Sequence, residues 1–393
     1  MTLLLDALDC LLFIPFLIWI VYVVVFAVAY RLPNAQILSQ SNSDLRYMVI
    51  FPAYKEDAVI VESVTKFLAQ DFPIEQFHCV VVADSMRSAT LDALSKLPIS
   101  LVIPDYTKRS KAAAINYALH KENSSLYQAV VVLDADNHVD HDFLKRVNAV
   151  FGSSNMAIQV HRKAKNQHTD VALLDGVSEE INNAIFREGH NKLGLPAALS
   201  GSGMIFDMKW FRHTMAKIDS VGEDKELEFY LLEDRIHTLY LTDVCVYDEK
   251  VSKRKDLSNQ RKRWMAAQLE LFMKLLKQLP LIIKEMNWPM LDKFIQMSIP
   301  PRILLLGWIP IWIIILGYLS PMLIRKWAII YVLLSIALLS VLPRRFYTIR
   351  TVKALFKLPI LMIAYLKSLL GVRSAKNKFI HTPHGESEKN NNH

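Results

Sequence analysis

The feature that most restricts the fold of this chain is an uncharged apolar run near its N-terminus, Leu11 to Tyr30. A run of this length crosses a bilayer as a helix, because a helix satisfies its own backbone groups in lipid. A signal peptide is a poor alternative, since no basic segment precedes the run and no small-residue cleavage site follows it. Two later runs, Ile303 to Ile324 and Trp327 to Leu342, have spanning or nearly spanning length. The sequence therefore predicts three membrane helices, with a buried core helix as the main alternative for the third.

The three runs divide the 393 residues into segments of different character. Lysine and arginine are abundant at the membrane-proximal ends of the long middle section, so the positive-inside tendency predicts that this section is cytoplasmic. We therefore expect a multi-pass membrane protein. The expected organisation is a membrane helix at 1–31, a linker at 32–44, a cytoplasmic domain at 45–270, interfacial amphipathic helices at 271–301, two membrane helices at 302–343, a basic interfacial or re-entrant helix at 344–376 and a tail at 377–393.

Charge and cysteine content narrow the class of partner. The formal net charge is +8, and basic residues cluster at 253–255, 261–263 and 373–378. Such clusters suit anionic headgroups or phosphates. No nucleic-acid-binding motif accompanies them, so we expect no nucleic-acid partner. The three cysteines have neither disulfide nor metal-site spacing, which is typical of a reducing compartment.

The most informative stretch in the middle section is Val130 to Leu133, which runs directly into Asp134 and Asp136. Four apolar residues, mostly β-branched, predict a buried parallel strand. The two carboxylates then lie at its C-terminal end, where open α/β sheets bind ligands. Such a pair holds a hard divalent cation, and the cation holds phosphates. An Asp-rich turn is the alternative.

The preceding strands support the ligand-binding interpretation. Strands are expected at 47–51, 77–82 and 99–103, and helices at about 58–69 and 112–120. This alternation predicts a parallel sheet with right-handed crossovers. Glu56 and Asp84 follow the first two strands, so they converge with Asp134 and Asp136 at one edge. No glycine-rich dinucleotide fingerprint or Walker A motif is present, so a cation and basic side chains must hold any diphosphate.

The motifs along the middle section resemble those of membrane-bound family 2 glycosyltransferases, which include cellulose, hyaluronan and poly-N-acetylglucosamine synthases and ceramide glucosyltransferases. The resemblance covers roughly residues 45 to 270 and implies an α/β class: a Rossmann-like GT-A catalytic domain with a mixed, mainly parallel sheet, plus transmembrane and interfacial helices. One departure is Gly222, which stands where the family usually has Thr. The matching motifs are Phe51-Pro-Ala-Tyr-Lys-Glu-Asp57, Ala83-Asp84-Ser85, Lys111-Ala-Ala-Ala-Ile-Asn116, Asp134-Ala-Asp136, Ser200-Gly-Ser-Gly-Met204, Glu223-Asp224 and Gln260-Arg-Lys-Arg-Trp264.

The resemblance implies an inverting hexosyltransferase that uses a nucleotide-sugar donor, with a UDP-sugar favoured, and Mg²⁺ or Mn²⁺ held by Asp136 and Asp134. An acceptor hydroxyl must lose its proton, and a positioned carboxylate can take it. Asp224 is the expected general base and Glu223 the second choice. The implied donor-binding residues are Ala53, Tyr54, Glu56, Asp84, Lys111, Asp134, Asp136, Gln260, Arg263 and Trp264, and the implied acceptor-binding residues are Gly201, Ser202, Gly203, Glu223 and Trp264.

Several alternatives stay open. The acceptor is a lipid or a saccharide, so the product is a glycolipid or a polysaccharide, and a second copy or an export partner would assist polymer export. Asn182, Asn183, Arg187 and His190 line the acceptor site or lie on a surface helix. A non-catalytic nucleotide-sugar-binding membrane scaffold is the alternative to an enzyme, and the complete set of carboxylates and the Gln-x-x-Arg-Trp motif argue against it.

The C-terminal third carries weaker signals. Amphipathic patterns predict interfacial helices at 269–282 and 286–297, with Pro280 breaking the first. Thr351 to Val372 contains three lysines and a proline, which favours an interfacial or re-entrant helix over a fourth span.

The tail from residue 377 is expected to dock near the catalytic opening as a gating segment. His381 and His384 have a spacing that binds metal on a helix, but Pro383 disfavours that helix.

Overall fold

The computed structural model describes residues 2–33, 45–106, 109–152, 156–218, 222–250, 254–357, 362–363 and 366. Most of the expected linker, most of the segment after 357, and the tail with His381 and His384 lie outside the described residues. The predictions made for those segments therefore stay predictions.

The centre of the chain is an eight-stranded mixed sheet in the order β3-β2-β1-β4-β7-β6-β8-β5. β1, β2, β3 and β4 run parallel, as do β6 and β8, whereas β7 is antiparallel to β4 and β6, and β5 to β8. The predicted α/β class with a mixed, mainly parallel sheet is confirmed. The strands are β1 Tyr47–Tyr54, β2 Phe77–Asp84, β3 Ser100–Val102, β4 Ala129–Val132, β5 His138–Val139, β6 Ala157–Ala164, β7 Met204–Asp207 and β8 Thr238–Asp248.

Helices cover both faces of the sheet, as the apolar strands require. Alternate side chains of β1 point to opposite faces. Val49 and Phe51 pack with α2 (Ile60–Leu68) and α5 (Phe143–Asn148), and Met48 and Ile50 pack with α4 (Lys111–Lys121) and α8 (Met208–Met215). Further helices are α3 Ser88–Leu94, α6 Asp170–Asn182, the π-helix η3 Asn183–Gly189, α7 His190–Lys192 and α9 Glu223–Glu233.

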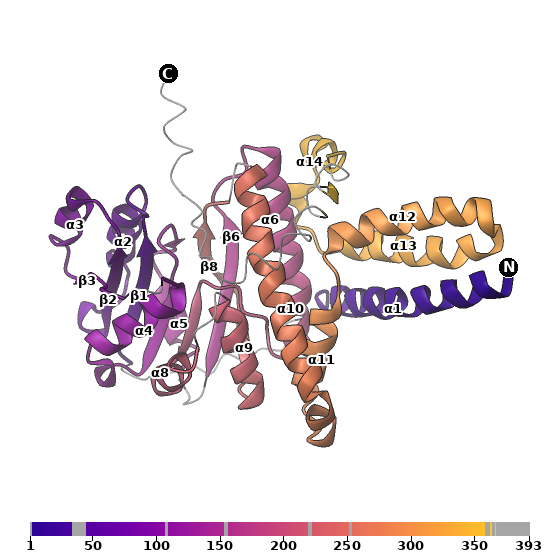
Figure 1. The fold of residues 1–393 in the computed structure, drawn as a ribbon. Helices are drawn as coiled ribbons and strands as arrows, with labels where there is room; N and C mark the ends of the chain where they lie inside the picture. The colour runs from indigo at the N-terminus through magenta and orange to yellow at the C-terminus, as the bar shows by residue number, and fades with distance from the viewer. Residues whose placement is uncertain are drawn as a thin grey trace.

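Three helices are long and apolar enough to span a membrane, over Leu5–Ala29, Arg302–Leu319 and Pro321–Ser340. They belong to α1 (Thr2–Ala29), α12 (Arg302–Leu319) and α13 (Ile324–Ser340), which lie together and project from one side of the sheet domain (Figure 1). The second helix is shorter than expected, because Ser320 and Pro321 interrupt it before Ile324.

The first span begins earlier than expected and includes Asp9, which is completely buried. Its Oδ1 accepts hydrogen bonds from Trp327 Nε1 at 2.8 Å and Trp312 Nε1 at 3.2 Å, and its carboxylate forms an ion pair with Lys326. These contacts join α1 to α12 and α13, so a polar cluster holds the three apolar helices in register.

One long helix, α10 (Arg254–Lys284), replaces the broken helix that was expected there. Pro280 does not break it, because Pro280 lies in the last turns and both it and Leu276, four residues earlier, are on the exposed side. The expected domain boundary after residue 270 falls inside α10. The remaining helices are α11 Trp288–Ser298, the 3-10 turns η1 Ile74–Gln76, η2 Ser124–Leu126, η4 Pro321–Leu323 and η5 Arg344–Phe346, and α14 Ile349–Leu355.

Candidate active site

A cavity of about 1260 Å³ opens at the C-terminal edge of β1, β2 and β4. Of the predicted site residues, only Ser202 and Gly203 are missing from its described lining. The predicted residues that line it are Ala53, Tyr54, Glu56, Asp84, Lys111, Asp134, Asp136, Gly201, Glu223, Asp224, Gln260, Arg263 and Trp264. Side chains from strand ends and from α10, far apart in sequence, therefore meet in one space.

A tight turn after β4 carries the two carboxylates. Asn137 N–H donates to Asp134 O, and Asp134 N–H donates to Asn137 Oδ1, each at 3.0 Å. Asp136 is 4% exposed, and its Oδ2 accepts the backbone N–H of Glu249, just beyond β8, at 2.6 Å. The turn is thus fixed from two sides.

This carboxylate pair fits a hard divalent cation that a donor diphosphate helps to bind. No group of three or more His, Cys, Asp or Glu side chains suited to a metal occurs among the described residues. Mg²⁺ commonly takes one or two carboxylates and completes its shell with phosphate oxygens and water. Asp134 and Asp136 supply that number of hard oxygen ligands at the rim of the cavity.

Lys111 lies between the two pairs of carboxylates. Its Nζ is 2.6 Å from Asp134 Oδ1 and 3.4 Å from Glu223 Oε1, and it also donates to Gly201 O. Burial disfavours the ammonium, but Asp134 and Glu223 outweigh burial and raise the pKa of Lys111. Lys111 is therefore a fixed positive charge beside the predicted phosphate position.

Glu223 and Asp224 are the first two residues of α9, as predicted, and they differ in environment. Burial raises the pKa of Glu223 to about 7, with Asp224 and Asp134 adding to the shift and Lys111 opposing it. The Asp224 side chain is 22% exposed and lies next to Gly201, where an added Cβ would be 3.8 Å from Asp224 Oδ2. Asp224 is thus the more accessible carboxylate.

The structure also explains the glycine before this pair. A Cβ at Gly222 would lie 2.7 Å from Ala267 Cβ on α10, so a side chain has no room there. The departure from the family pattern at Gly222 therefore accompanies the close approach of α9 and α10.

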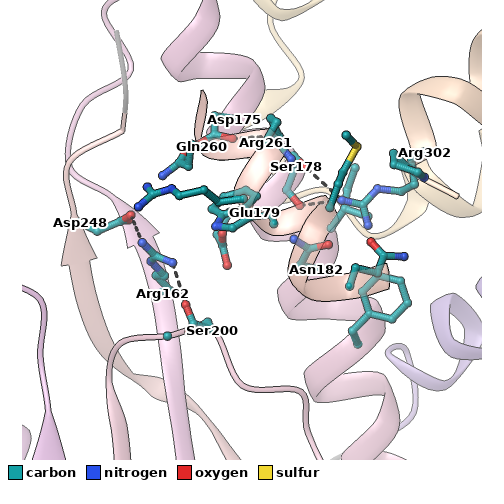
Figure 2. A pocket seen from close by; sticks show the side chains of 18 of the residues that line it. Arg162, Asp175, Ser178, Glu179, Asn182, Ser200, Asp248, Gln260, Arg261 and Arg302 are labelled. Carbon is teal, nitrogen blue, oxygen red and sulfur yellow. Dashed lines mark hydrogen bonds and ion pairs between the residues drawn. The ribbon is translucent and has the colours of Figure 1, made fainter. Parts of the chain in front are cut away.

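α10 supplies the Gln-x-x-Arg-Trp residues to the cavity. Trp264 is 39% exposed, and the Arg261 guanidinium lies over its ring at 4.9 Å from the centroid. Arg261 also forms a 2.5 Å ion pair with Asp175 of α6, which Figure 2 shows beside Gln260. This pairing ties the motif to the helix that forms the opposite wall.

Sequence reasoning missed a charged pair at the ends of β6 and β8. Arg162 Nη2 is 2.7 Å from Asp248 Oδ2, and Arg162 Nη1 donates to Ser200 O at 2.9 Å (Figure 2). Both side chains line the cavity. No local sequence pattern predicts this pair, because the two residues come from strands that are distant in sequence.

The segment with Asn182, Asn183, Arg187 and His190 is not a surface helix. Asn183, Arg187 and His190 are buried, and the first two belong to the π-helix η3. Asn182 and Arg187 line the cavity, and Arg187 forms a 2.8 Å ion pair with Glu179. An acceptor-side role is therefore compatible with Asn182 and Arg187 and stays a prediction, whereas Asn183 and His190 are not part of the described lining.

Ser202 and Gly203 point away from the cavity. Ser202 is buried, and its Oγ accepts the Asp134 N–H at 3.1 Å. Gly203 has φ +64°, and a Cβ there would lie 2.5 Å from Val160 Cγ2. Within the loop as described, Gly201 and Ser200 line the cavity, whereas Ser202 supports the carboxylate turn and Gly203 packs against Val160 of β6 and Val246 of β8.

The other end of the cavity is apolar and reaches the helices of membrane-spanning length. Beyond Arg302, whose Nη2 donates to Ser178 Oγ at 3.0 Å, the walls come from α12, α13 and α14. The apolar side chains there include Leu306, Pro310, Ile311, Tyr331, Leu338, Leu342, Val352 and Leu355. One continuous space therefore joins the carboxylates to the helices of spanning length.

A mixed sheet with a carboxylate turn at its edge and an acidic pair facing it is the arrangement of a GT-A glycosyltransferase. The chain belongs to the family described as "Glycosyltransferase like family 2", whose model matches residues 45–267, more than half of its length. The predicted family 2 hexosyltransferase and its GT-A fold are confirmed.

One solved structure supports the fold, and a second shows only a weaker likeness. Mannosyltransferase PcManGT from Pyrobaculum calidifontis, in complex with GDP-Man and Mn²⁺, has a TM-score of 0.56 at 15% identity, over 86% of this chain and 97% of that one. S. aureus TarS 1-349 with UDP-GlcNAc has a TM-score of 0.46 at 15% identity, over 84% and 90%. At these identities the likeness concerns the fold alone. No curated protein sequence matches the chain.

Proposed function

We propose that this protein is an inverting, divalent-metal-dependent glycosyltransferase that moves a sugar from a UDP-sugar to a lipid acceptor in the membrane. The observation that carries the proposal is the single cavity that joins Asp134, Asp136 and Asp224 to the apolar walls of α12 and α13. A nucleotide-sugar suits the polar end, and a lipid chain suits the apolar end. A saccharide acceptor would need polar walls along the second half.

Each group at the donor end of the cavity has one proposed role. Asp134 and Asp136 hold Mg²⁺ or Mn²⁺, which when bound stabilises the negative charge of the leaving diphosphate. Lys111 and Arg263 add positive charge beside the phosphates, and Arg is suited to bidentate phosphate binding. The remaining donor-end residues, Ala53, Tyr54, Glu56 and Asp84, hold the nucleoside, and Gln260 and Trp264 hold the sugar.

At the acceptor end, Asp224 is the proposed general base. Its carboxylate takes the proton of the acceptor hydroxyl while the hydroxyl oxygen bonds to the anomeric carbon. The bond from that carbon to the phosphate oxygen breaks, and its electron pair leaves with the nucleoside diphosphate. Attack on the face opposite the diphosphate inverts the anomeric configuration. Glu223 is the second candidate base, because its side chain is buried beside Lys111 and is less accessible to an acceptor than that of Asp224.

The three spanning helices, together with the lysines and arginines at the membrane-proximal ends of the middle section, support a multi-pass protein with its catalytic domain in the cytoplasm. In this proposal, residues 45–270 mark the approximate extent of the sheet domain. They do not mark the end of a helix, since α10 continues past residue 270. The product is then a glycolipid formed on the cytoplasmic side.

The test is to incubate purified full-length protein with single labelled UDP-sugars, Mg²⁺ or Mn²⁺ and a membrane lipid extract, and to size the products. One added sugar on an organic-soluble product supports the proposal, and a ladder of polymer lengths would replace lipid with saccharide. Donor binding without any transfer or hydrolysis would favour the non-catalytic scaffold. A matched Asp224→Asn sample controls for contaminating activity.

A further inference from the structure

Two adjacent residues of α11 connect different parts of the molecule. Asp292 faces α1 and α7, the short helix that follows η3: its Oδ1 accepts the Tyr22 hydroxyl at 2.8 Å, and its Oδ2 is 3.2 Å from His190 Nε2. The Tyr22 hydroxyl is also 2.8 Å from His190 Nε2. α11 is thereby fixed to the N-terminal helix and to α7.

The next residue, Lys293, faces the sheet domain instead. Its Nζ donates to Glu228 Oε1 of α9 at 2.6 Å, and both side chains are 3% exposed. Glu228 Oε2 accepts from Lys225 Nζ at 3.0 Å. The two lysines oppose the effect of burial and lower the pKa of Glu228 to about 2.

Glu228 and Lys225 together bind the backbone N–H and C=O of Leu199, in the loop before Gly201. The Leu199 N–H donates to Glu228 Oε1, and Lys225 Nζ donates to Leu199 O, each at 3.3 Å. Lys225 Nζ is also 3.9 Å from Asp224 Oδ2. A chain of contacts therefore runs from Tyr22 through α11 and Glu228 to the loop and helix end that flank the proposed base.

We infer that Glu228 and Lys293 are positioning residues, which orient the 199–201 loop and Asp224 toward the acceptor hydroxyl, with Asp292 fixing them to α1. The inference rests on the proposed function. A buried ion pair is weak support for stability, since apolar replacements of equal volume are often as stable. Glu228 instead has a geometric role, because it accepts the Leu199 N–H and binds Lys225, which donates to Leu199 O. Small displacements at a reacting centre reduce rates strongly.

The test compares Lys293→Met with Lys284→Met, the same change at an exposed site on α10. We expect Lys293→Met to lower kcat for transfer at least tenfold with the donor KM unchanged, Lys293→Arg to restore most of it, and Lys284→Met to match the parent. The double variant Glu228→Gln/Lys293→Met removes both buried charges, so that folding survives, and should retain the kcat loss. Parental kcat in the double variant, or a donor KM that rises with the loss, would overturn the inference.

A second measurement does not depend on turnover. In Lys293→Met, we expect backbone amides of 199–203 to exchange hydrogen at least tenfold faster, while those of β1 and β2 are unchanged. Unchanged exchange in the loop rejects the positioning role even if the enzyme is active. If exchange is faster in Lys293→Met and the parent protein itself transfers no sugar, the result supports the positioning role and rejects the proposed function instead.

Discussion

The two ends of the cavity are built in different ways. At the donor end, Asp84, Asp134 and Asp136 each lie at or just beyond the end of a buried strand, so local sequence determines where they are. At the membrane end, the walls come from α6, α10, α12, α13 and α14, which the chain brings together only by packing. A short motif can therefore specify the proposed donor site, whereas the space proposed for the acceptor depends on the packing of helices that are distant in sequence.

The largest expected effect is at the junction of the two ends. Asp224→Asn should reduce transfer by about 10²- to 10⁴-fold, because the acceptor hydroxyl loses its general base, while donor affinity is retained. Single-turnover rates and donor titration measure the two quantities. Glu233→Gln, an exposed carboxylate on the same helix, is the control. An Asp224→Asn enzyme with parental turnover would remove Asp224 from the mechanism.

At the donor end, Asp136→Ala should abolish the metal dependence of donor binding. The variant lacks the buried carboxylate proposed to bind the metal. Its donor Kd in Mn²⁺ should therefore equal the donor Kd of the parent in EDTA. Isothermal titration with and without the metal provides the comparison. A Kd that Mn²⁺ still lowers in Asp136→Ala would contradict the assignment of this carboxylate.

Glu223 allows a test by pH. Its folded-state pKa of about 7 exceeds the ordinary value of 4.5, so the folded protein holds the proton more tightly and stability falls as pH rises from 4.5 to 7. Glu223→Gln removes this penalty and should stabilise the donor-free protein at pH 8 by up to about 3 kcal/mol, with little effect near pH 4.5. Thermal unfolding at both pH values measures it. An equal gain at both values would exclude ionisation as the cause.

The smallest effect is expected at the membrane end. Ser335→Phe narrows the apolar part of the cavity and should lower transfer to a lipid acceptor about tenfold, a cost near 1.4 kcal/mol, while slow donor hydrolysis is unchanged. Val332→Phe, on the exposed side of the same helix, is the control. Equal loss of transfer and hydrolysis in Ser335→Phe would place the acceptor elsewhere.

The sequence was sufficient for β1 to β4 and the carboxylates that end β2 and follow β4, because apolar β-branched runs and the residues after them are local patterns, whereas β5 to β8 were not predicted. It placed Asp224 near the start of a helix for the same reason. Local patterns did not show which residues of a loop line the cavity, so the acceptor role expected for Ser202 and Gly203, which are not part of the described lining, stays a prediction. Arg162 and Asp248 were missed because each looks like an ordinary strand residue until β6 and β8 pair.

The sequence also predicted the helix boundaries in and near the apolar helices poorly. Proline was expected to end a helix at residue 280, yet the helix continues because that position lies on its exposed side. The first span was expected to begin after Asp9, since a charge usually marks the end of an apolar helix. The partners that make Asp9 acceptable, Trp312, Lys326 and Trp327, lie in the last two spans and are invisible to any local window.

The buried Asp9 cluster also has a consequence for biosynthesis. Asp9 is synthesised well before its partners, since Trp312 follows it 303 residues later in the chain. At roughly 5–20 residues per second, the carboxylate waits about 15–60 s for its partners. On insertion scales, an Asp at the centre of a membrane helix costs about 2.5–3.5 kcal/mol. A chain that ends before Trp312 therefore leaves the Asp9 carboxylate in α1 without the indole and ammonium groups that bind it in the finished protein.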